Sequence, residues 1–141
     1  MTSLISYRKV IDSVTTHLLR LPENDNRQPG GQELATLPDG RTVVALFDGT
    51  VLSADQPQTV RDSLEPLPTP LPDDLRAAIK TASPQVRHID NQVKAAIAER
   101  YAIEDEIKLL RLAPSDETLA YNAYVEECRA WGRAEKNKLG L

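Results

Sequence analysis

Apolar residues recur at intervals of three and four along residues 86–110, the longest regular pattern in the chain. The apolar members of this pattern are Val86, Ile89, Val93, Ala96, Ile103, Ile107 and Leu110. Arg100 is a polar residue on the same face, at a position equivalent to a in a heptad. This spacing places all of them along one side of an α-helix, as in a coiled coil. The pattern therefore predicts a long helix whose apolar seam requires a partner.

Residues that start and stop helices set the limits of this helix and predict two others. Pro84 suits a first helical turn, so the long helix is expected over residues 84–112. A short helix is expected over residues 73–82, because aspartates favour its positive end. After a cap at residue 115 or 116, a last helix runs to about residue 138. The C-terminal region is thus predicted to be a long α-helical hairpin with coiled-coil-like heptads.

The seam has two alternative partners. One is the face of the last helix formed by Tyr121, Tyr124 and Trp131, which recur at helical spacing. The other is a second copy of the chain; β-branched residues at both a and d favour three strands, hence a homo-oligomer such as a trimer. Arg100 either fixes register and oligomer state or extends past the seam. We take the seam and the facing residues as the candidate interface.

The N-terminal region has the short alternating runs of a β-sheet. Asp-Gly pairs at residues 39–40 and 48–49 suit tight hairpin turns and separate three of these runs. The expected strands are residues 32–37, 41–47 and 50–53. Residues 4–10 and 14–21 form either another hairpin, around residues 11–13, or an amphipathic helix; their β-branched content favours strands.

A Pro-rich segment joins the two regions. It contains Pro57, Pro66, Pro68, Pro70 and Pro72, and proline fixes φ and disfavours helix at the residue before it. The segment is therefore expected to be an extended, stiff connector. The predicted fold is α+β, with a small antiparallel β module at residues 1–53, the connector at 54–72 and the helical hairpin at 73–141, which serves oligomerisation or docking.

Composition limits the classes of function. Hydrophobic residues make up 40% and aromatic residues 4% of the 141 residues, so a large core is not expected. The net charge is −4, and neither half has the basic excess of a nonspecific nucleic-acid binder. A single cysteine excludes an internal disulfide framework. No signal peptide or membrane-spanning segment is recognisable, so a soluble protein is expected.

No group of residues has the spacing of a catalytic, metal or cofactor site. His17 and His88 are the only histidines, and neither lies within ligand spacing of others. Residues 104–106 are all acidic, but consecutive helical side chains point in different directions. Ion pairs Glu104–Lys108 and Asp90–Lys94 are the expected use of such charges, and Cys128 is expected to be a small buried residue. We therefore predict no enzyme activity and no cofactor.

The C-terminal sequence resembles small tail-region proteins of Mu-like bacteriophages. The resemblance is carried by RYAIEDEIKLLR at residues 100–111, YNAYVEECRAWGR at 121–133 and LGL at 139–141, within about the last sixty residues. Residues 37–52 are similar more loosely. The resemblance includes no catalytic motif. It implies a component of the virion tail, baseplate or tail fibre, or a factor that assists fibre assembly.

The expected function is accordingly that of a non-enzymatic tail structural protein. It would be assembled in the host cytoplasm, present in several copies in the virion and bound to other baseplate or tail-fibre proteins. The alternative is a tail-fibre assembly chaperone that is absent from the finished particle. A small wall hydrolase or nuclease is a third hypothesis, and it would need converging acid, base or metal-binding groups that the sequence does not display.

Overall fold

The computed structural model describes residues 2–11, 14–23, 27–112 and 114–141. It confirms the α+β class, with a four-stranded antiparallel sheet and several helices that make up 49% of the described residues. The chain forms two compact units. The sheet unit comprises Met1–Gln85 together with Lys138–Leu141, and the helical unit comprises Val86–Asn137. The predicted hairpin domain began earlier, at residue 73.

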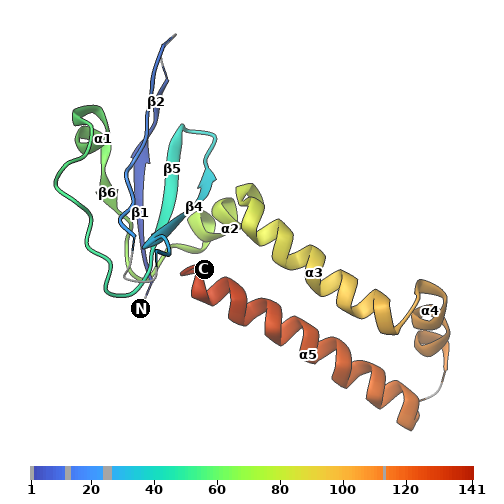
Figure 1. Ribbon diagram of the computed structural model, residues 1–141. Helices are drawn as coiled ribbons and strands as arrows, with labels where there is room; N and C mark the ends of the chain where they lie inside the picture. Colours follow the sequence, from blue (N-terminus) through green and yellow to red (C-terminus); the bar gives the residue numbers. More distant parts are fainter. Residues whose placement is uncertain (1, 12–13, 24–26, 113) are drawn as a thin grey trace. The chain divides into compact units, whose positions relative to one another are not determined.

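The sheet has the strand order β4-β5-β1-β6 (Figure 1). Its strands are β1 (Ser3–Arg8), β4 (Gly31–Thr36), β5 (Arg41–Leu46) and β6 (Glu65–Pro66). The strands β1, β4 and β5 confirm the predicted runs and the choice of strand over helix for residues 4–10. The hairpin turn between β4 and β5 places Gly40 at a φ of 92°, which glycine adopts without strain.

A separate two-stranded ribbon pairs β2 (Val10–Ile11) with β3 (Thr16–His17). The predicted hairpin is confirmed only in part: the strand expected over residues 14–21 is reduced to a pair of residues, and β1 pairs with β5 and β6 instead of with it. The turn expected at residues 11–13 lies partly outside the described residues.

The strand predicted at residues 50–53 is wrong. Both edges of β5 are already occupied, since β4 pairs along one side and β1 along the other. A tight turn after β5 is present, with the Thr50 backbone N–H donating to the Phe47 carbonyl at 3.0 Å. The chain then leaves the sheet because no neighbouring position beside β5 remains.

The Pro-rich segment is not an extended connector. It contains helix α1 (Gln58–Ser63) and strand β6, and Val60 of α1 is fully buried in the core with Ile5 and Tyr7. The prolines permit this because of where they fall: Pro57 precedes the helix and Pro66 lies on an edge strand, where no N–H is required. Residues 54–72 are therefore part of the sheet unit.

Burial in the sheet unit centres on β5. Residues 42–46 of this strand are all buried, and since side chains alternate between faces, both faces of β5 are covered. Helix α2 (Asp73–Ala82), predicted over the same residues, packs against β4. Ile79 of α2 and Leu34 of β4 are fully buried. Leu139 and Leu141 are also buried, so the end of the chain contributes to this unit.

The helical unit contains three helices where the sequence predicted two. They are α3 (Pro84–Arg100), α4 (Ile103–Arg111) and α5 (Asp116–Lys138), with α3 and α5 side by side in Figure 1. The single helix expected over residues 84–112 is therefore wrong, whereas α5 confirms the last helix. The interruption is at Ala102, whose φ of −68° and ψ of 161° are those of extended chain.

Candidate interaction surface

The inner faces of α3 and α5 meet through small side chains and an ion pair. A Cβ atom on Gly132 would lie 2.8 Å from Cγ2 of Val93, so the absence of a side chain lets the two helices approach. Nearby, Lys136 Nζ lies 2.6 Å from Asp90 Oδ1. Val86 and Ile89, the first members of the predicted seam, are buried. The N-terminal part of the seam is therefore not available to a partner.

Aromatic side chains surround the break between α3 and α4. The rings of Tyr101 and Tyr121 meet edge to face with their centroids 4.9 Å apart. The Tyr124 hydroxyl donates to the carbonyl of Ala96 at 2.8 Å. The guanidinium carbon of Arg100 lies 4.6 Å from the centre of the Tyr124 ring, a cation–π contact. Arg100 thus has a partner within its own unit, and Tyr121 and Tyr124 contact the segment that they were predicted to face.

Hydrogen bonding ties α4 to α5. The Tyr121 hydroxyl donates to Glu106 Oε1 at 3.1 Å. Desolvation, followed by this contact with a carboxylate, raises the pKa of Tyr121 above its ordinary value. Desolvation also raises the pKa of Tyr124, with the Cys128 thiol adding to the shift. Both phenols therefore stay protonated at neutral pH and act as donors that fix the helices.

The remaining seam residues form an exposed stripe on α4. Ile103, Ile107 and Leu110 are 72%, 44% and 78% exposed, respectively. At about 100° per residue they fall within about 60° of one another around the helix. We call these three residues the α4 stripe. Glu106 and Leu109 lie beside the stripe and are half-buried. That side of α4 therefore packs within the unit.

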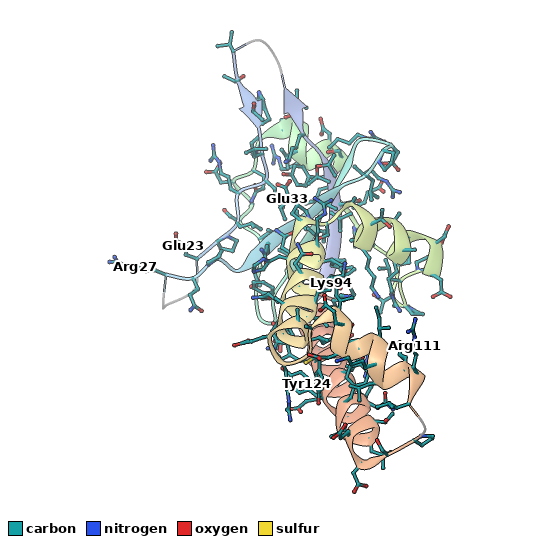
Figure 2. The ribbon with its side chains drawn as sticks, turned by 90° about the vertical axis from the view of Figure 1, so that its right-hand side faces the viewer. Glu23, Arg27, Glu33, Lys94, Arg111 and Tyr124 are labelled. Carbon is teal, nitrogen blue, oxygen red and sulfur yellow. The ribbon has the colours of Figure 1, made fainter. Side chains whose placement is uncertain are left out.

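Charged side chains flank the α4 stripe. The first turn of α4 carries Glu104, Asp105 and Glu106, whereas Lys108 and Arg111 lie towards its end (Figure 2 labels Arg111). The expected Glu104–Lys108 pair is not formed: in the described part of the chain, neither residue makes an ion pair. The expected Asp90–Lys94 pair is replaced by Asp90–Lys136, because α5 brings Lys136 within reach.

Two grooves border these helices. The larger, about 410 Å³, is lined by Arg100, Tyr101, Asp105, Lys108, Leu109, Leu112, Glu117 and Ala120. The smaller, about 270 Å³, lies between α3 and α5 and is lined by Val93, Ala96, Tyr124, Glu127, Cys128 and Trp131. Cys128 is buried as predicted, whereas Trp131 is 44% exposed at the edge of its groove. Trp131 is thus placed at the surface rather than deep between the helices.

Sequence reasoning named the members of the α4 stripe but not their exposure. It missed Tyr101 and Gly132, although a glycine four residues after Cys128 on one helical face was a readable signal of close packing.

Within the described residues, no three His, Cys, Asp or Glu side chains are grouped to hold a metal ion. No helix in this part of the chain is long and apolar enough to cross a membrane. No family model, curated protein or solved structure matches the chain.

Proposed function

We propose that this chain is a non-enzymatic structural protein of a bacteriophage tail, bound to the baseplate or the tail fibre and assembled through its C-terminal helices. The observation that carries the proposal is the α4 stripe. Ile103, Ile107 and Leu110 are large, apolar and exposed on one face of a nine-residue helix. Covering such a face removes apolar surface from water, which favours association.

The resemblance of the C-terminal sequence supports the tail assignment. Residues 100–111, which carry part of the likeness to tail-region proteins of Mu-like phages, form the break and α4. Residues 121–133 lie in α5, which holds α4 through the Tyr121–Glu106 hydrogen bond. The same segments therefore carry both the resemblance and the candidate surface. On this proposal the protein resides in the virion tail and contacts other tail proteins.

The first test is incorporation of an Ile103→Asp variant into phage particles. An aspartate at the first residue of α4 is compatible with the positive end of the helix, so helix content is expected to stay unchanged. The charge would, however, oppose burial of the α4 stripe against another protein. We expect wild-type chain in purified particles, detected by mass spectrometry, and at least a tenfold loss of the variant.

Leu119→Asp is the matched control. Leu119 is 65% exposed on α5, about 160° around that helix from Tyr121, and so points away from the contacts with α4. This variant should be incorporated normally. Normal incorporation of Ile103→Asp would contradict the proposed surface. Wild-type chain that binds unassembled fibre but is absent from finished particles would establish the chaperone alternative instead.

A further inference from the structure

Charge is distributed unequally along α4. Its acidic residues all lie in the first turn and its basic residues lie from position 108 onward. Glu104 and Arg111 are seven residues apart, and on a helix they fall on the same flank of the α4 stripe, at about 100° and 80° from Ile103. Both are exposed, and in the described residues neither makes an ion pair. Each helix therefore offers an acidic end and a basic end beside the same apolar stripe.

We propose that the occupant of the α4 stripe is α4 of a second copy of this chain, packed antiparallel across a two-fold axis near Ile107. In this arrangement Glu104 of each copy faces Arg111 of the other, so the ion pair forms twice. The leucine and isoleucines of the two stripes cover one another between these pairs. The inference rests on the proposed assembly role of the helical unit and names its partner.

The charge pattern disfavours parallel packing. Side by side in the same direction, two or three copies would bring their Glu104, Asp105 and Glu106 side chains to the same level, where like charges repel. A parallel trimer was also expected from a seam that ran along the whole of residues 86–110. That seam is not continuous, since α3 ends at Arg100 and its Val86 and Ile89 are buried.

The size of the contact indicates a weak pair. A helix of nine residues on each side gives an interface below the roughly 1,200 Å² that stable complexes bury. Such a pair gains from copies held close together, because tethering on a common particle raises their effective concentration. The contact suits copies that enter the tail together, so that the retention of each copy on the particle depends on its pair.

A charge-swap cycle tests the antiparallel arrangement. Sedimentation equilibrium at low salt would compare the full-length wild-type chain with Glu104→Arg, Arg111→Glu and the double variant. In each single variant, side chains of like charge face each other at both positions of the pair. We therefore expect the dissociation constant of the dimer to rise about tenfold or more. The double swap restores opposite charges and should recover the wild-type dissociation constant. Single swaps that associate as the wild type does, or a trimeric mass, would overturn the arrangement.

Leucine-to-serine variants test the apolar part of the contact. Leu110→Ser removes a member of the α4 stripe, whereas Leu119→Ser removes an equally large exposed side chain from α5. Circular dichroism would first show that both variants keep the wild-type helix content. Of these two variants, we expect only Leu110→Ser to sediment as a monomer. An equal loss in both variants would mean nonspecific association and would overturn the inference.

The failure of this inference is distinguishable from failure of the proposed function. A wild-type chain that is monomeric at every concentration but present in purified particles would overturn the antiparallel pair and leave the tail assignment standing. A chain that dimerises with the expected charge-swap behaviour but is absent from particles would overturn the tail assignment and leave the pair standing.

Discussion

A glycine in α5, Gly132, sets the spacing between α3 and α5. Gly132 is buried in the interior of α5, where glycine costs about 0.5–1 kcal/mol relative to alanine. Glycine is nevertheless favoured here, because the site has no room for the methyl group of alanine. A Cβ atom on residue 132 would lie 2.8 Å from Cγ2 of Val93. The single side chain of Tyr124 also joins the two helices, since its hydroxyl donates a hydrogen bond to the backbone of α3. Individual contacts, rather than a regular heptad seam, hold these helices together.

Gly132→Ala is predicted to destabilise the helical unit by about 1 kcal/mol, because overpacking exceeds the gain in helix propensity. Urea denaturation followed by circular dichroism would measure the change. Val93→Ala should make room for the new methyl group, so the double variant should be more stable than the sum of the two single effects predicts. A more stable Gly132→Ala protein would show that the helices do not touch here.

At the scale of elements, the break between α3 and α4 decides what the seam can do. The spacing of three and four continues through residues 101–102, yet Ala102 adopts extended chain and its backbone N–H donates to Asp105 Oδ2 at 3.3 Å. Asp105 thus satisfies a backbone donor at the start of α4. The interruption separates the buried residues at the start of the seam from the exposed α4 stripe at its end.

Ala102→Asn provides a test of this break. Asparagine is a strong N-cap residue, so at the start of α4 it should raise stability by about 0.5–1 kcal/mol in thermal denaturation. The matched control is Ala95→Asn, at an exposed site within α3, which should lower stability by about 0.5 kcal/mol. If residues 84–112 formed one continuous helix, both substitutions would destabilise the protein to a similar extent.

For the whole molecule, the sheet unit is completed by residues from both ends of the chain. The Thr2 hydroxyl donates to the carbonyl of Lys138 at 2.8 Å, and Leu139 and Leu141 are buried. A Cβ atom on Gly140 would lie 3.2 Å from the Leu4 side chain, and this glycine has a φ of 85°. The helical unit is therefore an insertion between two parts of the sheet unit.

Leu139→Ala is predicted to destabilise the sheet unit by about 2–4 kcal/mol, because it leaves a cavity among buried side chains. Amide hydrogen exchange should report faster exchange in β1 and β5, which are far from residue 139 in sequence. Leu119→Ala removes an exposed leucine and should leave these strands unchanged. Unchanged exchange in Leu139→Ala would mean that the C-terminal residues do not support the sheet.

Local sequence signals sufficed for several elements. The Asp-Gly turn and flanking β-branched residues predicted β4 and β5, because a tight turn fixes how its two strands pair. The start of α2 followed from the aspartates in its first turn, and the start of α5 followed from the cap expected at residue 115 or 116. The same signals identified Ile103, Ile107 and Leu110 as one helical face, because helix periodicity is a property of the local chain.

Other features depended on segments that are distant in sequence. The strand expected at residues 50–53 is displaced by β1, and the Pro-rich segment packs on the sheet instead of extending away from it. The exposure of the α4 stripe depends on which side chains α5 covers. The sequence by itself determined the periodic elements and their turns, since these arise from interactions between near neighbours. Only the tertiary structure decided strand neighbours, burial and the free face, because distant segments compete for the same space.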